Sequence, residues 1–425
     1  MRRRGTAFLA VTVAGALAAA SVSACSKDKD EGAKAQTVEV MSWWTGPGEA
    51  DGLSAMVALL KSQHPEITFS NSAVAGGSGV NAKAVLATRL SSNNPPDSFQ
   101  RHAGKEISTD IKNGDVEDLG YLYDKNGWRN SFPKGLLDAI SDNGKIYSVP
   151  VNIHRSNLLW FMPATLSSLG ISGPPKTWDE FLTQAALIKS KGKTAISVGP
   201  AWTQKHLLEN VLLGELGPDK YTGLWNGTTD WSSPDVVAAL QKFTKILTFS
   251  DITTAGADWQ PAADRVLEGA AVYNVMGDWM NAYLAGDKKL KFKEGYNVVA
   301  SPGTDGIYNF LSDSFTLPVG APHKAAAETW LTLCGSKEGQ DAFNPKKGSI
   351  PARTDADKSK YTDYLATALT DWTNPSTKVV GSLQHGVVAN DALNGEIDTA
   401  LGLFTKSGDA NAFATAVKQA YEKNK

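Results

Sequence analysis

The sequence predicts an α/β protein of two lobes, and its length and two features of the chain support this prediction. Strand and helix patterns alternate over residues 38–102, which indicates a largely parallel sheet with right-handed crossovers. The chain has 425 residues, enough for two hydrophobic cores. Extended segments at 145–152 and 157–161 predict a crossing into a second lobe. Such crossings form a hinge, so we expect the functional site in the cleft between the lobes.

The first strand pattern, residues 38–44, ends in Trp43 and Trp44 and is followed by a Gly/Pro turn at 45–48. In open α/β sheets, ligands bind outside the carboxyl ends of the strands. A Trp ring at that place can lie flat against the apolar face of a pyranose. The alternative is that both rings are core residues, since Trp is highly buried on average. That alternative is weaker for two neighbours, because successive strand residues point to opposite faces.

The remaining elements are predicted from the periodicity of hydrophobic residues and from residues that start or end helices and strands. The first lobe is predicted to contain a helix at 49–63 ended by Pro65, a strand at 67–70, a glycine-rich loop at 76–79, a helix at 80–90 and a strand at 98–102. In the second lobe we expect a helix from the capping box Thr177–Glu180 to residue 189, a strand at 195–198, and helices at 203–216, 234–247 and 262–267. A strand buried on both faces is predicted at 271–276.

The later chain predicts a return to the first lobe and a final passage to the second. Strands at 296–300 and 314–319 are assigned to the first lobe, a helix spans 325–343, and 360–425 is largely helical. The predicted boundaries are therefore 37–150 plus 296–348 for the first lobe and 151–295 plus 349–425 for the second.

The amino-terminal leader predicts export and lipidation. Arg2, Arg3 and Arg4 precede an apolar stretch at 6–20, which is too short to span a bilayer. The stretch ends in Val-Ser-Ala-Cys25, which resembles a bacterial lipobox. We therefore expect a signal peptide at 1–24, a lipidated Cys25 with a charged, flexible tether to residue 36, and anchoring to the outer face of the cell membrane. An ordinary secretory signal with an incidental Cys25 is the alternative.

Composition narrows the functional classes. The net charge of −2 argues against a nucleic-acid-binding protein, which would carry a basic patch. Only two cysteines are present, so a disulfide framework or Cys-rich metal site is not expected, and Cys334 falls in a helical pattern as a small buried residue. Twelve Trp residues in a chain of ordinary hydrophobicity favour carbohydrate binding.

Several segments, taken together and in order, resemble the extracellular solute-binding proteins of sugar ABC transporters, and most of all their glucose/galactose/mannose-binding branch. The segments are VMSWW at 40–44, PPD at 95–97, KIYSVPVN at 145–152, NVMGDW at 274–279, GSKEGQDAFNP at 335–345 and KGSIPAR at 347–353. The resemblance covers nearly the whole mature chain. It implies a type II periplasmic-binding-protein fold, in which each lobe is a mixed, mainly parallel sheet flanked by helices and the ligand lies in the hinge cleft.

The resemblance also implies a ligand-binding set, no metal, no cofactor and no catalytic residue. The implied ligand-binding residues are Trp43, Trp44, Glu49, Gln100, His102, Trp259, Trp279, Asp313, Lys347 and His385. Asp278 competes with Asp313 as the main acceptor from sugar hydroxyls. The implied partners are a monosaccharide such as glucose and the permease subunits of an ABC transporter, with the protein acting as a monomer.

The same residues suit a neutral polyol on chemical grounds. A buried hydroxyl without a partner costs about 1–3 kcal/mol, so a sugar site needs donors and acceptors as well as flat rings. Each residue alone has a simpler explanation: Glu49, for example, is an acid in the first turn of a helix, where the dipole favours it. The prediction therefore depends on the set.

Other functions remain open at this point. The solute could be an oligosaccharide. A secreted glycoside hydrolase would need two carboxylates about 5–10 Å apart, and Glu49, Asp278 and Asp313 are available. A metal-binding lipoprotein could use His102, His154 and His385, although none of these has metal-ligand spacing. A carrier of polyamines or peptides is a further alternative.

Overall fold

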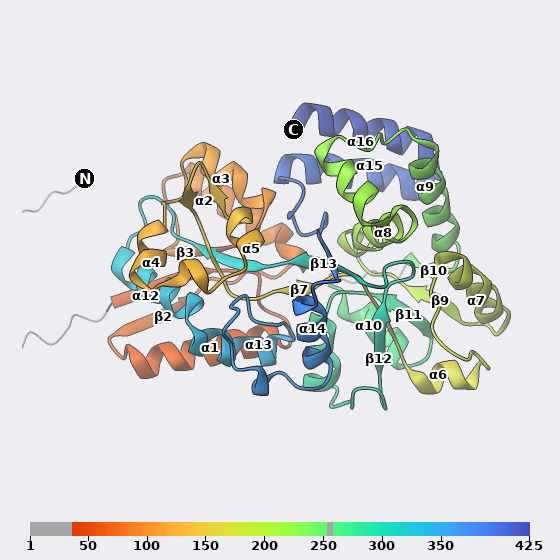
Figure 1. Ribbon diagram of the computed structural model, residues 1–425, viewed down its shortest axis with the longest axis horizontal. Helices are drawn as coiled ribbons and strands as arrows, with labels where there is room; N and C mark the ends of the chain where they lie inside the picture. The colour runs from red at the N-terminus through yellow and green to blue at the C-terminus, as the bar shows by residue number, and fades with distance from the viewer. Residues whose placement is uncertain (1–35, 253–257) are drawn as a thin grey trace, which may run out of the picture. The chain divides into compact units, whose positions relative to one another are not determined.

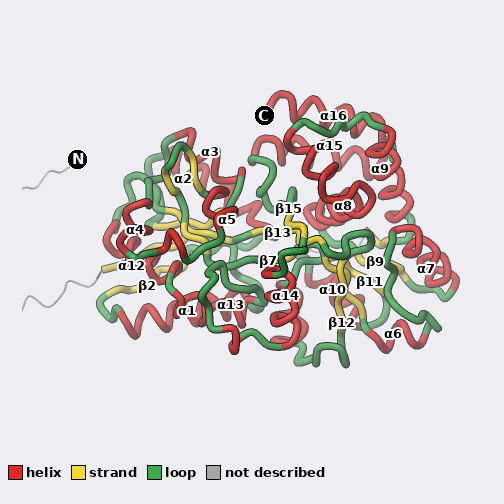
Figure 2. Tube along the Cα trace, in the orientation of Figure 1, coloured by secondary structure: helices red, strands yellow, loops and turns green. Residues whose placement is uncertain are grey.

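The computed structural model describes residues 36–252 and 258–425, in which two five-stranded sheets are joined by a smaller three-stranded one (Figures 1 and 2). The predicted signal peptide, Cys25 and nearly all of the predicted tether lie outside the described residues. Within the described residues, no helix has the length and apolar character needed to span a bilayer.

The first sheet has the strand order β2-β1-β3-β14-β6. Its strands are β1 (Gln36–Met41), β2 (Ile67–Asn71), β3 (Ser98–His102), β6 (Val149–Pro150) and β14 (Asp313–Thr316). β1 runs parallel to β2 and β3, whereas β14 is antiparallel to β3 and β6. We call this sheet with its helices the first lobe. The helices are α1 (Glu49–Gln63), α2 (Val80–Ser91), α3 (Ser108–Asn113), α4 (Gly120–Lys125), α5 (Lys134–Ala139), α12 (Lys324–Gly335) and α13 (Lys337–Lys347). A hairpin of β4 (Ser141–Asp142) and β5 (Lys145–Ile146) completes it.

The second sheet has the order β10-β9-β11-β8-β12. Its strands are β8 (Leu158–Phe161), β9 (Thr194–Ser197), β10 (Ser250–Asp251), β11 (Ala271–Val275) and β12 (Asn297–Ala300). β9 is parallel to β10 and β11, and β8 is antiparallel to both β11 and β12. This sheet and its helices form the second lobe. The helices are α6 (Pro163–Ser168), α7 (Trp178–Ser190), α8 (Ala201–Asn226), α9 (Pro234–Leu247), α10 (Gln260–Leu267), α11 (Trp279–Asn281), α15 (Asp391–Ser407) and α16 (Ala410–Asn424).

The three-stranded sheet lies between the lobes and carries the chain across. It consists of β7 (His154–Arg155), β13 (Ile307–Leu311) and β15 (Lys378–Gly381), in the order β15-β13-β7. Helix α14 (Asp363–Thr373) packs on it through Trp372, whose ring lies 5.1 Å from that of Tyr308. In the chain, β7 lies between β6 of the first sheet and β8 of the second, and β13 lies between β12 of the second sheet and β14 of the first. Residues beside β7 and β13 are therefore placed between the two lobes.

The predicted fold class is confirmed, and several predicted elements differ from the structure. The helix predicted at 325–343 is two helices, α12 and α13, separated by Ser336. The strand near residues 296–300 was assigned to the first lobe, but β12 pairs with β8 in the second sheet. Sheet membership depends on contacts distant in sequence, which local patterns do not report. The helix predicted at 203–216 continues to residue 226. It is interrupted at Gly217, which has a φ of 71° and is followed by Pro218. The capping box at Thr177 is present, with Thr177 Oγ1 accepting from Glu180 N at 3.1 Å.

Candidate ligand-binding site

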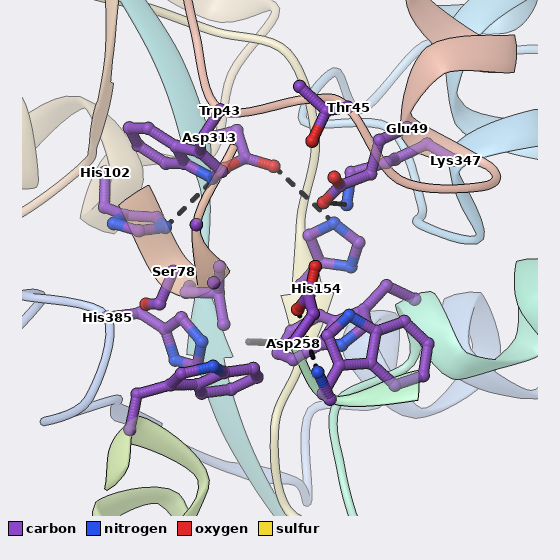
Figure 3. Close-up of a pocket in the computed structure, with 16 residues that line it drawn as sticks. Trp43, Thr45, Glu49, Ser78, His102, His154, Asp258, Asp313, Lys347 and His385 are labelled. Atoms are coloured by element: carbon purple, nitrogen blue, oxygen red, sulfur yellow. Dashed lines mark hydrogen bonds and ion pairs between the residues drawn. The ribbon is translucent and has the colours of Figure 1, made fainter. Parts of the chain in front are cut away.

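A pocket lies where the two lobes and the three-stranded sheet meet (Figure 3). Both lobes contribute to its wall. The lining residues are Trp43, Thr45, Glu49, Gly76, Gly77, Ser78, His102, His154, Trp202, Asp258, Trp259, Trp279, Leu311, Asp313, Lys347 and His385.

The first-lobe wall forms at one edge of the first sheet. Trp43 follows β1, His102 ends β3, and Asp313 begins the antiparallel β14 directly opposite His102. Parallel strands end at the same sheet edge and an antiparallel neighbour begins there, so these three side chains converge. The ring of Trp43 lies 4.9 Å from that of His102.

Asp313 is a buried carboxylate held by neutral and positively charged groups. Its Oδ1 accepts a hydrogen bond from Gln100 Nε2 at 2.9 Å, and its Oδ2 accepts one from Asn152 Nδ2 at 2.8 Å. Burial alone would raise the pKa of Asp313, but the hydrogen bond from His154 and the charge of Lys347 hold that pKa well below its usual range. Asp313 is therefore an ionised acceptor at neutral pH.

Two histidines lie beside Asp313, and each is oriented by a further carboxylate. His102 Nδ1 contacts Glu106 Oε2 at 2.8 Å, and His154 Nδ1 contacts Asp278 Oδ1. In each residue the other ring nitrogen, Nε2, lies 3.6 Å from an Asp313 oxygen. Burial lowers the pKa of His154, but Asp278 outweighs this effect and raises it above the ordinary value. The structure thus places Asp313 in the cavity wall and Asp278 behind His154.

Glu49, the first residue of α1, forms an ion pair with Lys347. Lys347 Nζ lies 3.3 Å from Glu49 Oε1, and Gly46 N donates to Glu49 Oε2 at 3.3 Å. Burial raises the pKa of Glu49, and the charge of Lys347 offsets part of that effect. Lys347 Nζ also lies 5.9 Å from the ring centroid of Trp279.

Aromatic rings dominate the second-lobe wall. Trp202 lies in the first turn of α8, Trp259 precedes α10, and Trp279 begins α11. The ring of Trp279 lies 5.2 Å from that of His385 and 6.4 Å from that of Trp202. His385 reaches the wall from the segment after β15, where Ser382 Oγ lies 2.9 Å from its Nδ1.

Two residues of the predicted set do not line the cavity. Trp44 is 1% exposed and packs in the core, with its ring 4.6 Å from Phe343 and 5.3 Å from Phe315. The prediction that Trp44 faces the ligand does not agree with this placement, because only one of two successive strand-end residues can point into the cavity. Gln100 lies behind the wall, where it donates to Asp313 and accepts from Trp43 N at 3.2 Å.

The sequence analysis did not assign several wall residues to the site, among them the aromatic Trp202 and the polar Asp258 and Ser78. Trp202 lies in the first helical turn after β9, whereas Trp43 was identified because it ends a strand pattern. Ser78 lies in the predicted glycine-rich loop and has a left-handed φ of 56°. His154 was considered only as a metal ligand.

The described residues include a group of metal-ligating type that extends inward from His385 of this wall. His206, Glu209 and His385 offer ligand atoms within 4.8 Å of one another. The Glu209 oxygens already accept hydrogen bonds from Ser382 Oγ at 2.9 Å and from Gln384 N at 2.8 Å. The carboxylate is thus engaged by protein donors, which is the arrangement of a structural buried acid.

Comparison with known proteins identifies the family. Residues 34–341 match the family described as bacterial extracellular solute-binding protein. The chain belongs to this family. This extracellular solute-binding protein therefore has the family membership that the sequence resemblance implied.

Its relatives are similar over most of their length. An uncharacterised ABC transporter extracellular-binding protein of Pyrococcus horikoshii is 30% identical over 99% of this chain and 95% of the relative. A probable sugar-binding periplasmic protein of Brucella suis is 32% identical, covering 83% of each chain. The xylose/arabinose-binding protein XacG of Haloferax volcanii is 28% identical over 90% of this chain and 84% of the relative. Among solved structures, a chitin oligosaccharide binding protein has a TM-score of 0.79 at 16% identity, covering 91% of this chain and 98% of that one.

Proposed function

We propose that this solute-binding protein binds a sugar in the cavity and delivers it to the permease subunits of an ABC transporter. The observation that carries the proposal is the wall itself, where Trp43, Trp259 and Trp279 face the same space as the donors and acceptors Asp313 and Lys347. Rings match the apolar faces of a pyranose, and charged groups make the stronger hydrogen bonds to its hydroxyls. The names of the Brucella and Haloferax relatives support a sugar as the solute.

Within this proposal the solute is a monosaccharide such as glucose or a similar hexose. The lining rings of Trp43, Trp259 and Trp279 are each less than 10% exposed, which supports rings that close over a single sugar unit. The oligosaccharide remains the alternative, and the disaccharides in the titration below distinguish the two.

The protein is proposed to act outside the cytoplasm as a monomer tethered to the membrane through Cys25. The apolar leader and the cysteine at its end support this localisation. Labelling of the cells with a radioactive fatty acid tests it: the protein should take up label, and Cys25→Ala should abolish the uptake.

The test of binding is a titration of the mature protein followed by tryptophan fluorescence. The ligands are glucose, galactose, mannose, xylose, maltose and cellobiose, with spermidine as a control of another class. A saturable response to one hexose is expected. A response to disaccharides alone would favour the oligosaccharide, and silence with every sugar would contradict the proposal.

Trp259→Ala tests the stacking role within the same titration. Loss of one ring face should weaken binding by about 1–3 kcal/mol with little change in the melting temperature. Trp372→Ala is the matched control, because Trp372 packs on the three-stranded sheet outside the cavity. Unchanged affinity in Trp259→Ala, or unfolding of that variant, would contradict the assignment.

A glycoside hydrolase is the second candidate, and one observation favours it. Glu49 has a raised pKa and Asp313 a lowered one, and such a divergence is found between the acid and base of hydrolases. Against it, Glu49 pairs with Lys347. A nearby ammonium group favours the ionised form of a carboxyl group, whereas the acid of a hydrolase must carry a proton. Incubation with aryl glycosides distinguishes the candidates: a binding protein releases no aryl alcohol and returns the sugar intact.

A further inference from the structure

Asp258 differs from the other carboxylates in the cavity wall. Glu49 pairs with Lys347, and Asp313 faces two histidines. The Asp258 carboxylate instead accepts a hydrogen bond from the backbone N–H of the adjacent Trp259, at 2.8 Å, and has no ion pair with any described side chain. The five residues before it, 253–257, contain no Lys, Arg or His.

The position of Asp258 makes this lack of a positive partner significant. The Asp258 side chain is partly buried in the wall, so its carboxylate has lost part of its hydration, and this burial raises its pKa. A partly dehydrated anion is unfavourable unless a cation or several donors compensate. Figure 3 shows Asp258 below Asp313, Glu49 and Lys347 in this view. Trp202, Trp259 and Trp279, from the second lobe like Asp258, line the same pocket.

The surrounding rings favour the same kind of ligand group. Trp202, Trp259 and Trp279 line the wall together with Asp258, and the rings of Trp202 and Trp279 are 6.4 Å apart. The face of a Trp ring attracts an ammonium group through its quadrupole, most strongly where water is excluded. A wall that combines a carboxylate with several Trp rings therefore suits an ammonium group.

We propose that the solute carries a basic amino group in addition to its hydroxyls, as an amino sugar does, and that Asp258 pairs with the ammonium group. This inference rests on the proposed function and specifies its substrate class. The hydroxyls lie with Asp313, Glu49 and Lys347 on the first-lobe side, and the ammonium group lies with Asp258 and the tryptophans on the second-lobe side.

The test compares glucosamine, glucose and N-acetylglucosamine by calorimetric titration of the mature protein at about pH 6.5, where a sugar amine is protonated and carboxylates are ionised. Glucosamine should bind about tenfold more tightly than glucose, because it adds a desolvated cation–carboxylate and cation–π contact. N-acetylglucosamine carries the same nitrogen without its charge and should show no such advantage.

Asp258→Asn assigns the preference to this residue. The ratio of glucosamine to glucose affinity should fall severalfold in this variant, because the neutral amide retains the shape without the charge while the Trp rings remain. Asp305→Asn is the control, since Asp305 is an exposed aspartate in the turn before β13, and it should keep the wild-type ratio.

Each outcome separates this inference from the function on which it rests. Glucose binding without a preference for glucosamine would overturn the inference and leave the sugar-binding proposal in place. An unchanged ratio in Asp258→Asn would also overturn it. Binding of spermidine with no response to any sugar would overturn both.

Discussion

Glu209 is a buried carboxylate that shares its surroundings with a buried histidine. Its oxygens accept hydrogen bonds from Ser382 and from Gln384 N, and burial raises its pKa to about 7. One helical turn earlier, His206 Nε2 lies 2.8 Å from Ser156 O, and burial lowers the pKa of His206 to about 4. The two shifts act in opposite directions on the pH dependence of stability, so the wild-type profile conceals both.

Glu209→Gln should reveal the contribution of the carboxyl group. A pKa of about 7 in the folded state against 4.5 unfolded means that this group stabilises the fold below about pH 4.5 and loses that contribution as the pH rises to 7. The free energy of unfolding of the wild type, minus that of the variant, should therefore fall by about 3 kcal/mol between pH 4.5 and pH 7. Urea denaturation at pH 4.5, 5.5 and 7 measures it.

The control for this experiment is Glu268→Gln, which removes an exposed glutamate after α10. Its effect on stability should be small and should not depend on pH. The assignment of the raised pKa to Glu209 would be contradicted if the difference in free energy of unfolding between wild type and Glu209→Gln stayed constant or grew with pH.

At the scale of elements, the loop between β2 and α2 connects the two lobes above the cavity. A Cβ atom at Gly77 would lie 2.1 Å from Trp202 Nε1, so the backbone approaches the indole as closely as only glycine permits. Ser78 Oγ accepts a hydrogen bond from Gln384 Nε2 at 3.1 Å. The loop thus contacts α8 and the segment before α15, both of the second lobe.

Gly77→Ala should weaken solute binding by about tenfold, because the added methyl group forces the loop away from Trp202 and opposes the approach of the lobes. The melting temperature without solute should change little, since residues 76–78 are only partly buried and can move away from Trp202 when the cavity is open. Tryptophan fluorescence titration measures the affinity. Gly135→Ala is the control: it has no atom within 4 Å of the added Cβ, and equal weakening in both variants would contradict the prediction.

Local patterns predicted the elements well where the signal is local. Pro65 ends α1, and strand alternation located β3 at residues 98–102. The placement of β12 was wrong because its partner β8 lies far away in sequence. Strand ends identified Trp43 and His102, whereas Trp44 could not be separated from Trp43 without knowing which side chain the core at Phe343 would take. Asp258 carries no local signal, since its role depends on the charges across the cavity.

At the scale of the whole molecule, ion pairs join the lobes beside the cavity. Asp391, at the start of α15, lies 3.8 Å from Lys83 Nζ in α2 and 3.5 Å from Arg101 Nη1 in β3. Lys83 also contacts Glu106 at 2.5 Å, and Glu106 holds His102 in the wall. The contact between lobes is therefore connected to a cavity residue through two further polar contacts.

Asp391→Asn should weaken solute binding by up to about fivefold at low salt, because it removes a partly exposed interlobe attraction of about 0.2–1 kcal/mol. The difference from wild type should vanish at high salt, where such charges are screened. Asp235→Asn is matched to it, as it also removes an acid from a first helical turn, but its partner Lys220 lies in the same lobe. A salt-independent effect, or equal effects of the two variants, would contradict this role.

The path of the chain also bears on how such proteins can diversify. The chain passes from the first sheet to the second between β6 and β8, returns between β12 and β14, and leaves again between α13 and α15. A single genetic crossover between two homologous genes would therefore join incompatible halves within at least one lobe. Exchange of an intact lobe needs several breakpoints at once. Solute preference in this architecture is thus expected to change by point substitution in the cavity wall, with the two lobes inherited together.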